Sequence, residues 1–177
     1  MAFLDQALKL SVAQAVTASA ASTNLYDVTG AGSGNAPNMI FGVDALGVQQ
    51  TAGFDIGTGD SAARPQLLLS VDTTFTAAGA ATLTVQIQAA PDNGSNLPGT
   101  YTTIVETGAL ALAQLTAGTL FAVPIPGLAP TEALPRFYRV NYVVATGPMT
   151  AGKISASILL NPPTQINVQY PANFVSV

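Results

Sequence analysis

Carboxylates are the side chains of this sequence that could carry out acid–base chemistry, because it contains no histidine and no cysteine. Histidine is the usual general base near neutral pH, and these two residue types supply most transition-metal ligands. Their absence excludes serine–histidine and cysteine–histidine catalysis and the common zinc sites. Two carboxylates about 5 to 10 Å apart suffice for a glycosidase, and the candidates are Asp72, Asp92, Glu106 and Glu132. Sugar-cleaving sites usually add aromatic platforms, and the chain has no tryptophan, so we expect no enzymatic activity.

Two glycine-rich segments have the composition of ligand-binding loops without the pattern that such loops need. Residues 30–35 would require a preceding strand, a following helix and often a Lys-Ser/Thr pair to cradle a phosphate, and none is evident. Asp55 and Asp60 lie in a second such segment, with Asp44 nearby in the sequence. Calcium favours oxygen ligands, but the spacing does not match the loop of helix–loop–helix calcium sites. We expect solvated loops and no cofactor, with ion binding at Asp55 and Asp60 left as an alternative.

Tyrosine and arginine gather in one segment, at Arg136, Tyr138, Arg139 and Tyr142. Both residue types are frequent anchors of protein interfaces. In a β-strand, however, successive side chains point to opposite faces. Tyr138 and Tyr142 then share one face and are predicted to enter the core, whereas Arg139 points to the other face beside Asn141. We therefore predict that Arg139 is exposed or lies in an interface.

The elements that carry these side chains are indicated by apolar–polar alternation between glycine, proline and asparagine turns. Residues 82–89 alternate most strictly, and the turn signal at residues 91–94 predicts a long-looped hairpin with residues 101–106. Further strands are predicted at residues 39–44, 66–75, 109–112, 119–125, 136–144 and 153–160, with prolines placing 119–125 at a sheet edge. About eight short strands are typical of an antiparallel β-sandwich or jelly roll, so the predicted fold class is all-β.

A chain of 177 residues indicates one domain, which we place at residues 26–161 between two extended arms. The N-terminal arm comprises residues 1–25. Residues 3–16 within it are ambiguous, because their apolar residues recur every four positions as in a helix and also alternate as in a strand. We favour an extended or partly helical arm. The C-terminal tail, residues 162–177, is apolar and strand-like, and we expect it to pack on its own domain or to lie on a neighbour.

The surface must be built largely from uncharged residues, since 8% of the chain is charged and 49% is hydrophobic. Such a surface is poorly protected against self-association. We expect it to be covered by other subunits, and the alternative is an ordinary threonine-rich β-domain. The net charge of −4 and the five scattered basic residues provide no electrostatic footprint for nucleic acid.

Two apolar segments need to be tested against membrane-directed sequences. Residues 109–130 carry no charge, but they contain Gly118, Pro124 and Pro126, so we expect no membrane-spanning helix. Residues 1–20 end in a cleavage-like Ala-Ser-Ala triplet, yet Asp5 occupies the place of the basic region of a signal peptide. Neither a membrane partner nor a secretion signal is predicted.

Several stretches of the sequence occur in an order and spacing found in one known family. They are residues 8–27, 68–75, 83–88 with Asp92 and Asn93, 136–142 and 150–156. In these stretches, which cover most of residues 8–160, the chain resembles the capsid cement (decoration) proteins of tailed bacteriophages, in particular the small jelly-roll family of Bordetella-type podophages. The resemblance implies a homotrimer on the outer surface of an icosahedral head, where it clamps neighbouring subunits of the major capsid protein. It implies no catalytic residues.

We therefore predict a structural role in the virion, with the major capsid protein and further copies of this chain as partners. The apolar arms and Arg139 supply the candidate partner-binding residues: Phe3, Leu4, Leu8, Leu10, Arg139, Ile166, Val168, Tyr170 and Phe174. Two alternatives remain, namely another virion component such as a tail or fibre jelly roll, and a carbohydrate-binding β-sandwich. The missing tryptophan counts against stacking on sugars.

Overall fold

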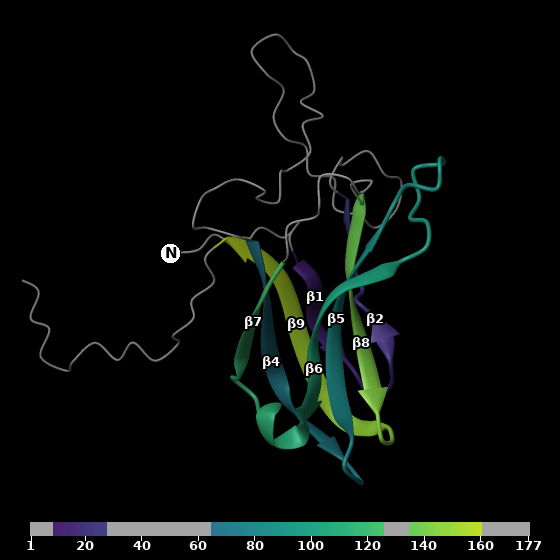
Figure 1. Cartoon of the computed structure of the whole chain (residues 1–177). Coiled ribbons are helices and arrows are strands. Elements are labelled where there is room, and N and C mark those ends of the chain that lie inside the picture. Colours follow the sequence, from purple (N-terminus) through teal and green to yellow (C-terminus); the bar gives the residue numbers. More distant parts are fainter. Residues whose placement is uncertain (1–8, 28–64, 126–134, 161–177) are drawn as a thin grey trace, which may run out of the picture.

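β-Strands joined by turns make up nearly all of the computed structural model, which describes residues 9–27, 65–125 and 135–160 (Figure 1). The strands are β1 (Lys9–Ala15), β2 (Ala20–Ala21), β3 (Tyr26–Asp27), β4 (Pro65–Ala77), β5 (Thr82–Ala90), β6 (Thr102–Ala111), β7 (Leu120–Pro124), β8 (Phe137–Ala145) and β9 (Met149–Leu160). A short 3₁₀ helix, η2 (Leu112–Gln114), connects β6 to β7. Within these three ranges no helix has the length and apolar character needed to cross a membrane.

The strands form two antiparallel sheets. Sheet A has four strands in the order β1-β9-β4-β7, and sheet B has five, in the order β2-β8-β5-β6 with β3 also paired to β8. When β2 and β3 are counted as two pieces of one interrupted strand, the strands run 1-8-3-6 in sheet A and 2-7-4-5 in sheet B. This is the strand order of a jelly roll. The predicted antiparallel sandwich is confirmed, and so is the hairpin of β5 and β6.

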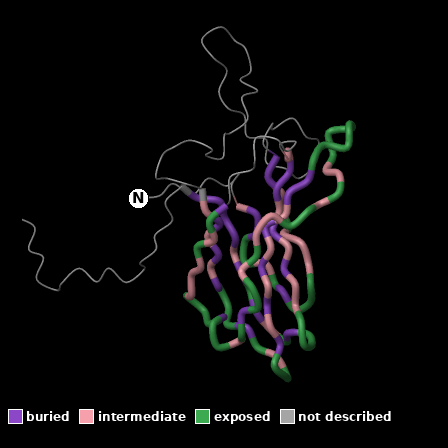
Figure 2. Tube along the Cα trace, viewed as in Figure 1, coloured by how far each residue is buried: buried purple, intermediate pink, exposed green. Residues whose placement is uncertain are grey.

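The core is filled by the inward side chains of both sheets, because strict alternation places every second residue there. In β5, Leu83, Val85 and Ile87 are buried, and the threonines and glutamines between them are only partly covered. Tyr138 and Tyr142 of β8 also point inward, as predicted, with 6% and 0% of their surface exposed. Figure 2 shows buried residues along the strands of both sheets and exposed residues gathered in the turns. Burying each large apolar side chain contributes about 1.5–3 kcal/mol, so this core dominates the stability.

The first described residues belong to the sandwich and not to a separate arm, which corrects the predicted domain boundary at residue 26. β1 pairs with β9, and β2 pairs with β8. Leu10 and Val16 are 1% and 0% exposed. The pairing of β1 with β9 has two register shifts, one between Lys9 and Ser11 and one between Ser11 and Gln14. The second contains Ala13, whose φ is 44°, and Val12, which is 54% exposed although strict alternation with the buried Leu10 would place it in the core. Pairing with β9 also satisfies backbone groups that a detached arm would leave to water.

Three other predicted segments have different outcomes. Residues 101–106 and 109–112 were expected as separate strands, but they form one strand, β6, which is bulged near Gly108 where φ is 73°. β7 lies at the edge of sheet A and ends at Pro124, as its proline predicts. The expected strand at residues 39–44 and the C-terminal tail lie outside the described residues.

The two ends of the sandwich differ in how the chain passes through them. At one end, which we call the turn end, short connections join successive strands at residues 16–19, 78–81, 112–119 and 146–148. At the opposite end, the loop end, the β5–β6 loop projects and all six boundaries of the described ranges meet, at the top of Figure 1. The register places them together through the pairs Pro65↔Leu160, Gln66↔Pro124 and Asp27↔Phe137. Every described range therefore begins and finishes on the same side of the domain.

Candidate partner-binding surfaces

The residues predicted to bind partners fall into three groups in the structure. Leu10 is a correction: it is 1% exposed and packs in the core, because β1 is a strand of sheet A, so it is not available to a neighbour. Arg139 lies half-buried on the outward face of β8, where the strand pattern placed it. The remaining candidates lie outside the described residues: Phe3, Leu4, Leu8, Ile166, Val168, Tyr170 and Phe174.

The outer face of sheet B is a hydrogen-bonded array of polar side chains around Arg139. The Nε of Arg139 donates to Oε1 of Gln88 at 2.9 Å, and the guanidinium carbon lies 3.7 Å from the centre of the Tyr101 ring. One row further along the sheet, Nε2 of Gln86 donates to Oε2 of Glu106 at 3.1 Å. Such cross-strand pairs stabilise the sheet and fix one another's rotamers. The face is therefore ordered and polar, and its positive and negative charges are both engaged in the array.

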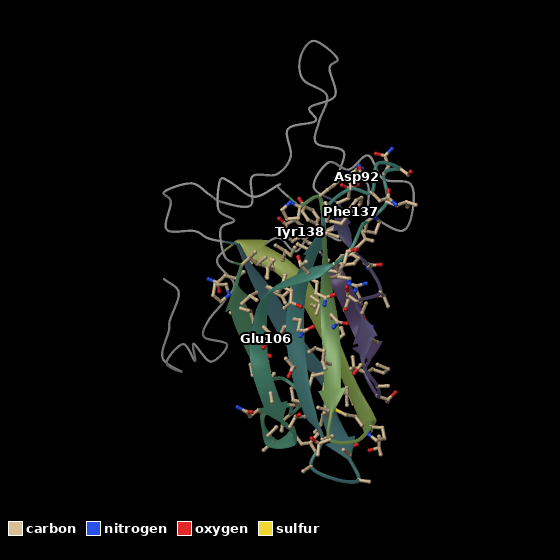
Figure 3. The ribbon with its side chains drawn as sticks, turned by 45° about the vertical axis from the view of Figure 1, so that its right-hand side comes forward. Asp92, Glu106, Phe137 and Tyr138 are labelled. Atoms are coloured by element: carbon tan, nitrogen blue, oxygen red, sulfur yellow. The ribbon has the colours of Figure 1, made fainter. Side chains whose placement is uncertain are left out.

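A buried ionic network closes the loop end of the sandwich. Arg136 donates from Nε to Oδ1 of Asp27 at 2.9 Å and from Nη2 to Oδ2 of Asp27 at 3.0 Å. Its Nη1 donates to Oδ2 of Asp92 and to Oδ1 of Asn96, the latter at 2.8 Å. The Asp27 side chain is 0% exposed and that of Arg136 is 11% exposed. One guanidinium thus joins the end of β3, the β5–β6 loop and the start of β8, at the end where Figure 3 labels Asp92 and Phe137.

Hydrogen bonding within the network favours the charged forms of Arg136 and Asp92. The hydrogen bond to Asp27 raises the pKa of Arg136 above its usual value. Desolvation acts to raise the pKa of Asp92, but hydrogen bonds from the Gly94 amide and the Arg136 side chain together lower it below its usual value. Bidentate, charge-assisted hydrogen bonds are directional as well as strong. The network therefore fixes the relative orientation of the segments that it joins.

Two tyrosines pack beside the network. The ring centres of Tyr26 and Tyr138 are 6.4 Å apart. The hydroxyl of Tyr26 is buried and has no hydrogen-bond partner among the described residues. Burial, and next the neighbouring Asp27, raise the pKa of Tyr26 to about 12, and burial also raises the pKa of Tyr138. Both phenols therefore keep their protons at pH values where an exposed tyrosine, with a pKa near 10, begins to lose its own.

The β5–β6 loop is held in one shape by its own side chains. Oδ1 of Asp92 accepts hydrogen bonds from the amides of Gly94 at 2.8 Å and Asn96 at 3.1 Å. The Asn93 amide donates to the carbonyl of Leu97 at 2.9 Å. Gly94 and Asn96 have positive φ values of 88° and 60°, a conformation that glycine and asparagine adopt most readily. The loop presents Leu97 to solvent, with 46% of its surface exposed.

The carboxylates considered as a catalytic pair are not brought together. Asp72 lies on the outer face of sheet A, where Oγ of Ser155 donates to it at 2.6 Å. Glu106 lies on the outer face of sheet B, and Asp92 lies in the loop above it (Figure 3). Glu132 falls outside the described residues. A glycosidase needs two carboxylates close together, and the three described candidates, Asp72, Asp92 and Glu106, do not provide such a pair.

Within residues 9–27, 65–125 and 135–160, no group of three or more acidic side chains is arranged to hold a metal ion. Asp27 and Asp92 both bond the guanidinium of Arg136, which supplies the positive charge next to these two carboxylates. Asp44, Asp55, Asp60 and the glycine-rich residues 30–35 lie outside the described residues, so ion binding at Asp55 and Asp60 stays a prediction.

Sequence reasoning missed both the ionic network and the shaped loop. Arg136 and Asp27 are 109 residues apart, and no local pattern links them. The jelly-roll topology contains the signal. β3 and β8 are antiparallel neighbours, so an acidic residue at the end of β3 and a basic residue just before β8 lie at the same end of the sheet. For the loop, the signal was Leu97 itself, a large apolar residue within a run of asparagine, serine, glycine and proline.

Comparison with known proteins matches a family model, Bbp16, to residues 10–158. The match begins in β1 and ends in β9, so it spans the whole sandwich described above. None of the curated proteins matches the chain. The family match and the fold therefore cover the same part of the molecule.

Proposed function

This chain belongs to the Bbp16 family, a phage-associated family, and from that premise we propose that it is a structural cement (decoration) protein of a phage head. In this role it belongs to the virion, binds the outer surface of the icosahedral capsid and stabilises the contacts between major capsid subunits. It has no catalytic role. The observation that carries the proposal is the family match across residues 10–158, together with the earlier resemblance to cement proteins over nearly the same range.

The physical character of the surface supports attachment through apolar contacts and hydrogen bonds. The chain has 5 basic and 9 acidic residues, and several of them, including Arg136, Asp27 and Glu106, already bond within the molecule. A protein that touches more than one capsid subunit gains from effective concentration, so that modest contacts add up. Because it binds the assembled shell and not the free subunits, it also stabilises the shell by mass action.

In the proposed assembly the protein acts as a homotrimer, and residues 1–8 and 161–177 are candidates for reaching neighbouring subunits. The apolar character of both segments supports their role as contacts, because apolar side chains gain from burial against a neighbouring subunit. Native mass spectrometry of the purified protein tests the oligomeric state. We expect a stable trimer in solution. A protein that is monomeric in solution and also binds isolated heads as a monomer contradicts the proposed trimer.

The head-binding role is tested with heads prepared without this protein. Purified protein is added back and sedimented with the heads, and the melting temperature of the heads is compared with and without it. We expect saturable co-sedimentation and a higher melting temperature of the shell. An unrelated β-sandwich protein at the same concentration serves as control. Binding to purified tails in place of heads would favour the alternative role as a tail or fibre component.

A further inference from the structure

We infer that the loop end is the surface that docks onto the capsid shell, with Leu97 as its apolar anchor and Arg136 as the residue that positions the loop. This inference rests on the proposed function, because it takes the shell as the partner. The partner surface that fits is a protein surface of low charge with an apolar recess for a leucine side chain.

Leu97 and Val12 are the two large apolar side chains that are exposed in the described part of the chain, at 46% and 54%. The exposure of Val12 has a local cause, since it precedes the bulged Ala13 in the edge strand β1. Leu97 has no such cause, because it sits in a loop whose other residues are polar, glycine or proline. A single exposed leucine is ordinary by itself. What distinguishes Leu97 is the rigidity of the loop that carries it.

The loop is built to hold Leu97 in one position before any partner arrives. Its base is closed by the hydrogen bond from the Gly99 amide to the Pro91 carbonyl at 2.8 Å, and its tip by the bond from the Asn93 amide to the Leu97 carbonyl at 2.9 Å. Asp92 adds side-chain bonds to the amides of two further residues. Binding then immobilises few groups that were mobile before, so little conformational entropy is lost. More of the free energy of apolar burial therefore appears as affinity. An anchor at the centre of an interface needs such a support.

Arg136 connects this loop to the rest of the loop end. Its guanidinium holds Asp92 and Asn96 on one side and the buried Asp27 on the other. Stability alone does not require this buried network, because well-packed apolar residues stabilise a fold as well or better. A fixed direction of the loop relative to β3 and β8 is what the ionic network adds. Arg136 is therefore a positioning residue and makes no contact with the partner itself.

The charge of the loop indicates the chemistry of its partner. Asp92 is the one ionised residue in residues 91–99, and it is bonded to Arg136. The loop therefore offers a partner an apolar side chain and neutral amides, which match a surface that has few charges and an apolar recess. A strongly basic or acidic surface would gain nothing from it.

The layout of the chain also favours this end. All six boundaries of the described ranges lie at the loop end. The turn end consists of short connections, and its described residues include no exposed large apolar side chain. Docking through the loop end brings Leu97 and these chain boundaries to the shell together.

The test compares Leu97→Asp and Leu97→Ala with Val12→Asp, which places the same charge at an equally exposed apolar position away from the loop end. Binding of each full-length variant to heads prepared without the protein is measured by titration and sedimentation. We expect Leu97→Asp to weaken binding by about tenfold or more, Leu97→Ala by a smaller factor, and Val12→Asp by less than about twofold. Because both sites are exposed, the melting temperatures of the three free variants should stay within about 2 °C of the unmodified protein.

The outcomes separate the inference from the function on which it rests. If the unmodified protein does not bind heads, the cement role is wrong and the docking surface falls with it. If the unmodified protein binds and Leu97→Asp binds equally well, the cement role stands and the loop end is not the docking surface. An equal loss in Leu97→Asp and Val12→Asp also overturns the inference, because the effect would then not depend on the loop.

The positioning role of the network is tested by Asn96→Gly, which allows the positive φ of 60° and removes the side-chain bond to Arg136. We expect weaker binding to heads, by about threefold, with Leu97 still present. Combining Asn96→Gly with Leu97→Ala should lose less than the product of the two single effects, because the anchor is already gone. If the double variant instead loses the full product of the two single effects, Asn96 does not act by positioning Leu97.

Discussion

A single guanidinium sets the geometry at the loop end. Arg136 satisfies the fully buried carboxylate of Asp27 through two hydrogen bonds and reaches Asp92 and Asn96 with its remaining nitrogen. Buried ion pairs add little net stability compared with apolar packing, but removing one partner leaves the other charged and desolvated. The side chains of this network therefore matter more for where the segments lie than for how stable the protein is.

Asp27→Asn is expected to lower the free energy of unfolding by about 3 kcal/mol, because it leaves the guanidinium of Arg136 without its buried counter-charge. Asp72→Asn is the matched control: Asp72 is exposed and bonded to Ser155 by one hydrogen bond, so its loss should cost about 0.5 kcal/mol or less. Urea denaturation of both variants measures the difference. Equal stabilities of the two variants would show that the network is not a structural requirement.

Stability should fall at alkaline pH because of the buried tyrosines. Burial raises the pKa of Tyr26 to about 12, whereas an unfolded tyrosine titrates near pH 10. The unfolded state therefore loses its proton first, and the stability that is present below about pH 10 is lost as the pH rises towards about 12. Urea denaturation at a series of pH values measures this slope.

Tyr26→Phe isolates the contribution of that one phenol. The variant should have a shallower alkaline slope than the unmodified protein. It should also be as stable at neutral pH, or more stable by up to about 1 kcal/mol, because the buried hydroxyl has no hydrogen-bond partner among the described residues. An unchanged alkaline slope would assign the effect to other groups.

Among the elements, β4 and β9 make a close contact where the ring of Phe75 lies against Gly152. A Cβ at Gly152 would overlap the ring of Phe75, and Gly152 has a φ of 147°, which side-chain-bearing residues rarely adopt. Register shifts interrupt the pairing of these two strands between Val71 and Ala77. The glycine thus lets an aromatic ring of one strand lie against the backbone of the next at an irregular part of the sheet.

Gly152→Ala is therefore expected to destabilise the fold by about 3 kcal/mol, through overpacking against Phe75 and backbone strain. Gly79→Ala is the control, because a Cβ there would meet nothing within 4 Å. Thermal denaturation of both variants gives the comparison, and Gly79→Ala should be nearly neutral. A small effect at Gly152 would mean that the two strands can move apart without cost.

The elements were predictable where one face of a strand is buried and the other is solvated. Alternation in residues 82–89 and 153–160 gave strands close to β5 and β9, and the two tyrosines of β8 were assigned to the core correctly. β1 was left ambiguous because its apolar residues fit both a helix and a strand, and the exposed Val12 beside Ala13 departs from the alternation in the structure itself. The Arg136–Asp27 pair was missed because its two partners meet only through the strand order of the jelly roll.

For the whole molecule, the scarcity of charge has a direct consequence for its attachment. With 8% charged residues, and with Arg136, Asp27 and Asp92 bonded to one another, the contacts to the proposed shell should depend mainly on apolar burial and neutral hydrogen bonds. At 1 M salt the Debye length is about 3 Å, so interactions between exposed charges that are further apart are largely screened, whereas apolar burial is not weakened. Attachment should therefore be insensitive to ionic strength.

We expect the protein to stay on heads that are washed with about 1 M NaCl, a concentration at which surface ion pairs are largely screened. Sedimentation of washed heads, followed by quantification of the retained protein, measures this. A parallel wash in urea below the unfolding transition of the free protein should remove more, because urea weakens apolar contacts. Loss of the protein in salt alone would assign the attachment to charged residues.

The segregation of chain boundaries to one end leaves the other end available for a different use. Residues 78–80 connect β4 to β5 at the turn end and are exposed, and a Cβ added at Gly79 meets nothing. A foreign peptide spliced into this connection would project from the pole opposite to Leu97 and would disturb neither the ionic network nor the chain boundaries. If the protein docks on a head through the loop end, as proposed above, a peptide inserted between β4 and β5 would lie on the side of the domain that faces away from the shell.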